Sequence, residues 1–180
     1  NRLLDVTLDT IDSEIEAVLE TVGRTYGFDR TFLFRYAPQS GYRNTHEWVA
    51  PGVVPLKPAM QVEAPVVRPD WHQAFIAGRI VAVHDRDELP PGSPERRFLT
   101  EIGVHSTLMV PLGDGDQLIG VIGFDCGHPD RHWAQDAVFL LTSIGRAISS
   151  VLLRAEAARA EAASRSHLQA TLDALPDLVI

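Results

Sequence analysis

The amino-acid sequence predicts an α+β domain with a central antiparallel sheet that is covered on both faces and a long C-terminal helix. Two pairs of β-rich segments, each joined by turn-forming residues, predict antiparallel hairpins. Apolar residues recur at helical spacing near both ends of the chain, which predicts amphipathic terminal helices. Because the second hairpin is apolar in both alternating registers, the sheet is expected to be covered on both faces.

The N-terminal part of the chain predicts a helix followed by a hairpin. Residues 4–22 carry apolar side chains at alternating spacings of three and four, with acidic residues on the other sides. The helix should end within residues 23–27, where glycines can adopt the left-handed conformation of a helix C-cap. Residues 31–37 and 42–49 are rich in aromatic and β-branched types and flank a Pro-Gln-Ser-Gly turn, so they predict two paired strands.

The middle of the chain predicts a loop and short elements. Residues 50–69 contain five prolines, too many for a regular helix or a central strand. A short helix is expected over residues 71–77 and a brief strand over residues 80–83. Another helix should run from Ser93 to Gly103, because serine caps a helix N-terminus and proline follows it at the first helical position.

The C-terminal part predicts a second hairpin and a long helix. Residues 107–112 and 118–124 are apolar runs separated by Gly-Asp-Gly-Asp, the strongest hairpin pattern in the chain. From Ala134 a helical pattern continues without a breaker as far as Pro176. A helix of about 40 residues would be about 60 Å long, so it is expected to project beyond the domain.

Composition excludes several classes of function. The formal net charge of −8 disfavours a phosphate-binding surface, so nucleic acid is not an expected partner. Cys126 is the single cysteine and forms no internal disulfide. No continuous apolar run approaches the about 20 residues that cross a bilayer, which predicts a cytoplasmic location without membrane contact. Both ends of the sequence suggest a segment of a longer protein.

Three stretches of the chain resemble GAF domains of bacterial multidomain sensors. They are THEWVAPGV at 45–53, EIGVHSTLMVPLGDGDQLIGVIGFD at 101–125 and RHW at 131–133, and the resemblance covers residues 5 to 152. It implies a sheet with the terminal helices on one face, and with helices, loops and a ligand pocket on the other.

A second resemblance concerns the C-terminal end. The stretch LQATLDALPDLVI, residues 168–180, resembles the opening of a PAS domain. The two resemblances together imply a GAF domain over residues 1–152, a connecting helix over 153–170 and the start of a PAS domain over 171–180. An output domain such as a histidine kinase or a cyclic-di-GMP synthase or hydrolase is expected beyond it.

The resemblance to GAF domains also implies a pocket with aromatic walls. The residues expected to border it are Phe34, Tyr36, Trp48, Trp71, Phe75, His105 and Asp125. Aromatic bodies with a few polar tips suit a small organic ligand. The alternative is a filled core without a ligand, because aromatic residues at strand and helix spacings are first of all core residues.

The sequence does not predict catalysis, a metal site or a known GAF cofactor. It lacks a nucleophile elbow, a Walker loop and a His-Glu-x-x-His motif. The segment from Cys126 to His132 gathers a thiol, two imidazoles and a carboxylate, but without a second ligand cluster we interpret it as a polar loop. Residues 85–92 contain no cysteine where phytochrome-like GAF domains attach a bilin, which argues against a covalent bilin.

Non-covalent haem is also disfavoured. Three histidines are expected near the pocket, namely His72, His84 and His105. A lone histidine is more often a hydrogen-bonded structural residue than a ligand, and nothing else in the sequence specifies haem. The identity of any cofactor therefore stays open.

The terminal helices predict a homodimer. Their apolar positions are Leu8, Ile11 and Ile15 in the first helix and Leu141, Ile144, Ile148 and Val151 in the last. Such helices can pair as a four-helix bundle or coiled coil. Beyond Val151 the seam contains mainly alanine, which predicts weak, easily shifted pairing.

The functional hypothesis is a non-catalytic sensory module. A ligand or partner would shift helix packing, and the last helix would transmit that shift to PAS and output domains. The alternative is a dimerisation scaffold without a ligand. An enzyme such as a GAF-like methionine sulfoxide reductase is disfavoured, because that chemistry needs several cysteines.

Overall fold

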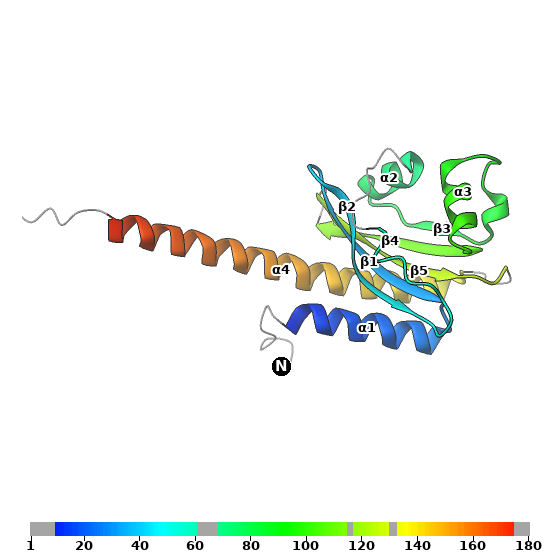
Figure 1. Cartoon of the computed structure of the whole chain (residues 1–180), viewed down its shortest axis with the longest axis horizontal. Helices are drawn as coiled ribbons and strands as arrows, with labels where there is room; N and C mark the ends of the chain where they lie inside the picture. Colours follow the sequence, from blue (N-terminus) through cyan, green and yellow to red (C-terminus); the bar gives the residue numbers. More distant parts are fainter. Residues whose placement is uncertain (1–9, 61–67, 115–116, 130–132, 175–180) are drawn as a thin grey trace, which may run out of the picture.

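The structure, a computed structural model, consists of a five-stranded antiparallel sheet between two layers of helices (Figure 1). It describes residues 10–60, 68–114, 117–129 and 133–174. The elements in chain order are α1 (Ile11–Tyr26), β1 (Arg30–Ala37), β2 (Gly41–Val49), α2 (Pro69–Ile76), β3 (Val81–Val83), the 3₁₀ helix η3 (Arg86–Glu88), α3 (Pro94–Glu101), β4 (Ser106–Asp114), β5 (Gln117–Cys126) and α4 (Gln135–Ala174). The strand order is β2-β1-β5-β4-β3, and neighbouring strands are antiparallel. The predicted α+β fold is confirmed.

Two of the predicted helix ends carry the expected capping residues. α1 ends at Gly27, whose φ of 64° lies in the left-handed region that glycine adopts without steric strain. The Ser93 hydroxyl accepts a hydrogen bond from the Arg96 backbone N–H at 3.2 Å, and Pro94 occupies the first turn of α3. Local sequence therefore determines where these two helices end and begin.

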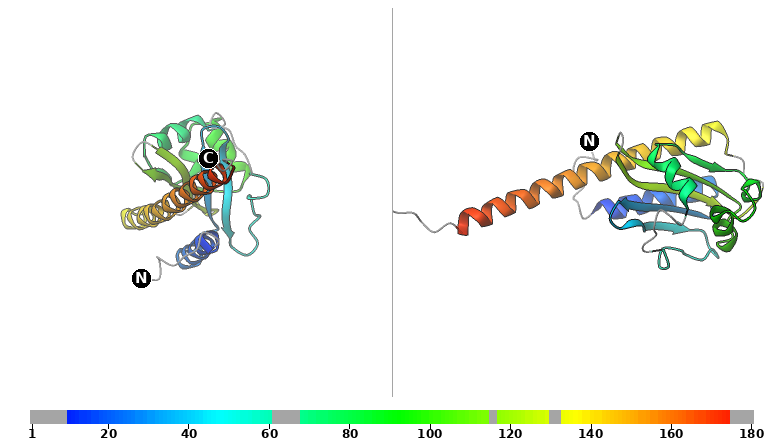
Figure 2. Two further views of the ribbon diagram at one scale, coloured as in Figure 1. Left: turned by 90° about the vertical axis from the view of Figure 1, so that its left-hand side faces the viewer. Right: turned by 90° about the horizontal axis from the view of Figure 1, so that it is seen from above.

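The sheet has a hydrophobic core on each face, as its apolar registers predicted. One core joins the sheet to α1 and α4 through residues such as Leu19, Leu33, Ile122 and Leu141. The other joins it to α2 and α3 and contains Phe32, Trp71, Phe75, Leu99 and Val121. Figure 2 shows the same two layers from two further directions, with α1 and α4 side by side.

Four residues that were predicted to form a dimer interface are instead buried within this one chain. Ile11, Ile15, Leu141 and Ile148 are at most 6% exposed and belong to the core between the sheet, α1 and α4. The sheet covers the strongest apolar stripe of each helix, and dimerisation through the terminal helices stays a prediction. Ile144 and Val151 are only half-buried. Leu8 lies outside the described residues, as do the turn at Gly115 and the PAS-like residues after Ala174.

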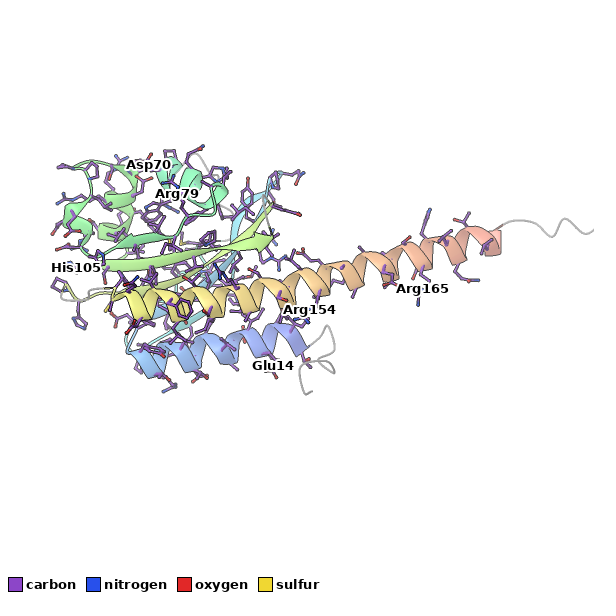
Figure 3. The ribbon with its side chains drawn as sticks, turned by 180° about the vertical axis from the view of Figure 1, so that it is seen from behind. Glu14, Asp70, Arg79, His105, Arg154 and Arg165 are labelled. Carbon is purple, nitrogen blue, oxygen red and sulfur yellow. The ribbon has the colours of Figure 1, made fainter. Side chains whose placement is uncertain are left out.

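α4 continues well beyond the sheet, as predicted from its unbroken pattern. It has 40 residues, and residues 157–172 are exposed to solvent. Figure 3 shows Arg165 on this projecting part, where it pairs with Glu161 one turn earlier at 2.8 Å. By length and composition, α4 is also apolar enough to cross a membrane. Its buried residues Leu141, Ile148 and Leu152 pack in the core, so the apolar character of its first half serves the fold.

The substitution Ile148→Asp tests the placement of Ile148 in the core. It should lower the free energy of unfolding by about 3 kcal/mol or more, because it removes buried apolar contacts and buries an unpaired carboxylate. Urea denaturation followed by circular dichroism measures this change. Ser150→Asp, at an exposed position on the same helix, should have little effect. Wild-type stability of Ile148→Asp would contradict the intramolecular placement.

Candidate functional site

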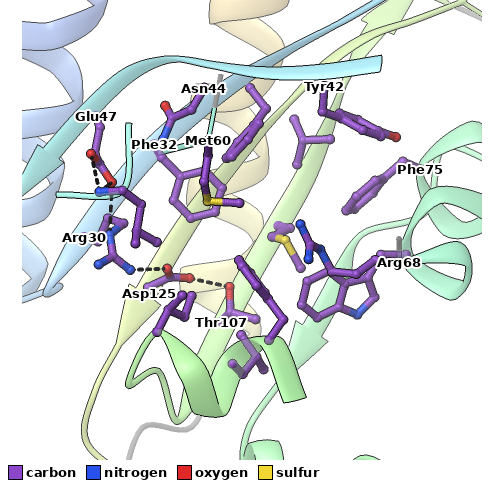
Figure 4. Close-up of a pocket in the computed structure, with 18 of the residues that line it drawn as sticks. Arg30, Phe32, Tyr42, Asn44, Glu47, Met60, Arg68, Phe75, Thr107 and Asp125 are labelled. Atoms are coloured by element: carbon purple, nitrogen blue, oxygen red, sulfur yellow. Dashed lines mark hydrogen bonds and ion pairs between the residues drawn. The ribbon is translucent and has the colours of Figure 1, made fainter. Parts of the chain in front are cut away.

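A small cavity lies between the sheet and the α2–α3 layer. Its volume is about 70 Å³. Its walls are mainly apolar and include Phe32, Phe34, Trp71, Phe75, Met109 and Val121. Polar side chains at the same cavity include those of Arg30, Asn44, Glu47, Thr107 and Asp125, all five of which are labelled in the close-up of Figure 4. A mostly apolar cavity with a few converging polar groups is the usual form of a small-ligand site.

Three of these polar residues form one row across the sheet. Arg30 on β1 and Thr107 on β4 are both direct cross-strand neighbours of Asp125 on β5. Arg30 Nη1 donates a hydrogen bond to Asp125 Oδ2 at 3.2 Å, and Thr107 Oγ1 donates one to Asp125 Oδ1 at 2.7 Å (Figure 4). Antiparallel register therefore brings Arg30 into one row with Thr107 and Asp125, which lie 77 and 95 positions later in the sequence.

Glu47 completes the charged group around Arg30. Arg30 Nε lies 3.1 Å from Glu47 Oε1, and both side chains are almost completely buried. The Glu47 carboxylate accepts hydrogen bonds from the backbone N–H groups of Leu56 and Lys57, the latter at 2.7 Å. Arg30 Nη2 also donates to the Val54 carbonyl at 2.9 Å. Buried charges are tolerated where they are paired and hydrogen-bonded in this way, and the same bonds attach residues 54–57 to the sheet.

The carboxyl group of Asp125 binds its proton more tightly than an exposed aspartate does. Complete burial raises the pKa of Asp125 from its ordinary value of 3.8 to about 6. The positive charge of Arg30 and the hydrogen bond from Thr107 oppose this rise but do not cancel it. The cavity wall therefore contains a group that titrates close to neutral pH.

Asn44 is the cavity residue with an unsatisfied amide. Its side chain is 2% exposed, and neither Nδ2 nor Oδ1 has a hydrogen-bond partner among the described residues. Its backbone is held in place, because its N–H donates to the Met60 carbonyl at 3.0 Å. Buried polar atoms in folded proteins are nearly always hydrogen-bonded, so this amide calls for a partner in the cavity.

The structure brings four of the seven predicted pocket residues to the cavity. Phe34, Trp71, Phe75 and Asp125 line it. The remaining three, Tyr36, Trp48 and His105, do not, and each has a physical reason.

Trp48 lies on the opposite face of the sheet, against Gly23 of α1. The cause is a β-bulge: Phe34 pairs with Asn44 and Leu33 pairs with His46, which leaves Thr45 as an extra residue in β2. Strict alternation from Asn44 would have placed Trp48 in the cavity. The extra residue reverses the alternation, so that Glu47 lines the cavity and Trp48 packs on α1.

Tyr36 and His105 lie beyond the two ends of the cavity. The Tyr36 ring packs against Tyr42, with 4.7 Å between the ring centres, instead of reaching the cavity. His105 immediately precedes β4 at the end of the sheet (Figure 3), and its backbone N–H donates to the Cys126 carbonyl at 2.9 Å. Whether a side chain contacts the cavity thus depends on its position along the strand as well as on the face of the sheet to which it points.

The residues considered for cofactors and metals are dispersed. His72 lines the cavity, and its Nδ1 lies 2.8 Å from the Tyr42 hydroxyl, whereas Nδ1 of His84 accepts a hydrogen bond from the Trp133 backbone. Cys126 is buried at the end of β5 and does not line the cavity. Within the described part of the chain, no three metal-ligating side chains come together. Asp130 and His132 lie outside that part.

Sequence reasoning missed Arg30, Asn44, Glu47 and Thr107. For Arg30 and Thr107 the available signal was a polar residue in a largely apolar strand, since such a residue needs a buried partner; β2 is itself mostly polar, so Asn44 and Glu47 gave no such signal. Asp125 shared the signal of Arg30 and Thr107 and was found through the family resemblance. The pairing among these residues required the strand register.

The raised pKa of Asp125 predicts a specific dependence of stability on pH. Because the folded state holds this proton more tightly, the contribution of Asp125 to stability is complete below pH 3.8 and is lost as the pH rises through about 6. The free energy of unfolding of wild type minus that of Asp125→Asn should fall between these values, by at most about 1.4 kcal/mol per pH unit. Urea denaturation across this range measures the difference, and a flat or rising curve would contradict the raised pKa.

Comparison with known proteins agrees with this architecture. The family model described as "GAF domain" matches residues 10–152. The methanogenesis regulatory histidine kinase FilI of Methanothrix harundinacea is 31% identical in an alignment of 166 residues that covers 84% of this chain and 18% of that kinase. The chain thus spans about a fifth of the length of this relative.

Two solved structures show the same fold. The blue-light absorbing form of the Thermosynechococcus elongatus PixJ GAF domain has a TM-score of 0.74 and 24% identity, covering 89% of this chain and 95% of that one. The phycocyanobilin-bound GAF domain of a cyanobacterial phytochrome has a TM-score of 0.69 and 16% identity, covering 81% and 85%. Since the family model covers most of the sequence and the fold agrees, this chain belongs to the GAF domain family.

Proposed function

We propose that this chain is the non-catalytic sensory domain of a signalling protein, in which a small ligand in the cavity alters the packing of α4. A PAS domain and an output domain such as a histidine kinase would follow α4. The likeness to a regulatory histidine kinase supports a kinase as the output domain. The cytoplasmic location expected from the sequence belongs to the same proposal.

The observation that carries the proposal is the continuity between the cavity and α4 through strand β1. Phe34 lines the cavity. The next residue, Arg35, points to the opposite face of the sheet and forms an ion pair with Glu156 on α4. Glu156 directly precedes the exposed part of α4. A small displacement of β1 by a ligand would therefore act on α4 at the point where the helix leaves the domain.

The dimensions of the cavity favour a ligand smaller than a bilin. The phytochrome GAF domain is described as phycocyanobilin-bound. In this chain the cavity volume of about 70 Å³ is well below the roughly 300–1,000 Å³ of pockets for drug-sized ligands. Cys126, the single cysteine, lies away from the cavity, so a covalent bilin has no attachment point there.

We further propose a homodimer through the outer face of α4. Leu140, Ile144, Ala147 and Val151 are exposed or half-buried, with Leu140 38% exposed. Their alternating spacing of four, three and four residues places them on one stripe of the helix, as in a coiled-coil seam. Leu168 and Leu172, each 60% exposed on the projecting part, supply further apolar contacts to an identical helix.

The ligand proposal predicts that a small molecule co-purifies with the protein. Native mass spectrometry should show a stoichiometric added mass on wild type that disappears in Val121→Phe, because the larger side chain fills the cavity. Val121→Ile, which adds one methyl group, should keep the mass. Circular dichroism checks that each variant is folded. A wild-type mass equal to that of the bare chain would favour the scaffold without a ligand.

The dimer proposal predicts that Ala147→Glu yields monomers. Ala147 is exposed, so the substitution leaves the core intact while it places like charges opposite each other in the seam. Sedimentation velocity should show a dimer for wild type and for Ser150→Glu, an exposed control on the same helix. A dimeric Ala147→Glu or a monomeric wild type would reject this interface.

A further inference from the structure

We propose that the cavity recognises a small neutral molecule carrying an amide-type edge, with a hydrogen-bond donor and an acceptor side by side that pair with Asn44. This inference rests on the proposed function, in which the cavity binds a ligand, and adds the chemical class of that ligand.

The Asn44 side chain defines the shape of the recognition group. It is 2% exposed and lines the cavity, and both its Nδ2 and its Oδ1 lack partners among the described residues. One donor and one acceptor separated by a single carbon are matched by another amide, lactam or urea edge. The match holds for either orientation of the Asn44 amide, because a half-turn merely exchanges the donor and the acceptor.

The charges around the cavity favour a neutral ligand. Arg30 is paired with both Glu47 and Asp125. Arg68 also lines the cavity, and its guanidinium lies 3.8 Å from the centre of the Phe98 ring. The cavity wall thus contains two arginines and two carboxylates, whose formal charges cancel. No opposite charge would therefore compensate the free-energy cost of desolvating a charged ligand.

The volume and the neighbours of Asn44 limit the size of the ligand. A buried water needs roughly 10–15 Å³ of such space, so the cavity of about 70 Å³ holds the equivalent of about five to seven waters. Asn44 pairs with Phe34 across the strands, and its backbone N–H is bonded to Met60, another cavity residue. An amide head at Asn44 with a short apolar tail against these side chains suits the space.

Propionamide, propionate and butanone form a matched set of probes. They have the same number of non-hydrogen atoms, but propionate is an anion and butanone lacks a donor. The chain contains two asparagines, Asn1 and Asn44, so the Asn44 side-chain NH₂ signals can be assigned in a ¹H–¹⁵N correlation spectrum of protein labelled with ¹⁵N at asparagine only. We expect a saturable shift of these signals with propionamide, and roughly tenfold weaker binding of the other two probes.

Two variants complete the test. Asn44→Leu keeps a similar shape, should remain folded and should lose the thermal stabilisation that propionamide gives to wild type. Gln73→Leu removes an exposed amide on the neighbouring helix α2 and should retain that stabilisation. Equal binding of all three probes, or unchanged stabilisation of Asn44→Leu, would overturn the amide class.

The result also separates this inference from the proposed function. If propionamide produces no saturable shift while a native ligand co-purifies with wild type and is lost in Val121→Phe, the ligand class is wrong and the sensory proposal stands. If no ligand co-purifies and no probe binds, water alone satisfies Asn44 and both proposals fall.

Discussion

The polar end of the cavity depends on the ion pairs and the hydrogen bond that the buried guanidinium group of Arg30 forms. This group joins Asp125 on β5 and Glu47 on β2, and it donates to the Val54 carbonyl in the segment after β2. Removing the arginine would leave two carboxylates buried without a cation, which is far less favourable than the paired state. One side chain thereby sets the spacing of three strands and holds the proline-containing segment over the site.

The same strands of the sheet contribute side chains to two different environments, one on each face. On one face, strand residues meet α2 and α3 around the cavity, and on the other they meet α1 and α4. His46 illustrates the second face, since its Nε2 lies 3.3 Å from Asp12 Oδ1 of α1, two residues after the cavity-lining Asn44. β1 and β2 each carry a cavity residue close to a residue that contacts a terminal helix, which makes them the mechanical link between ligand and helices.

Local signals in the sequence were sufficient for most of the fold, because helix spacing, capping by Ser93 and Gly27 and turn-forming residues act within a few positions of the chain. The two-sided apolar character of β4 and β5 likewise revealed a covered sheet.

The site was less predictable. The row of Arg30, Asp125 and Thr107 depends on strand register, and the inward position of Glu47 depends on a bulge that no local pattern announced. The buried positions of Ile11 and Ile148 show a related limit, since an apolar stripe does not state whether a sheet or a second chain covers it.

The bulge at Thr45 lets the cavity residues of β2 be substituted separately from the residues of β2 that contact α1. Point substitutions at Asn44 or Glu47 alter the chemistry inside the cavity while His46 and Trp48 keep their contacts with α1. Ligand preference and helix coupling can therefore diverge separately among related proteins. Deleting Thr45 would remove the bulge but would leave Asn44 and Glu47 facing the cavity and His46 and Trp48 facing α1, so this strand can lose its extra residue without exchanging its two faces.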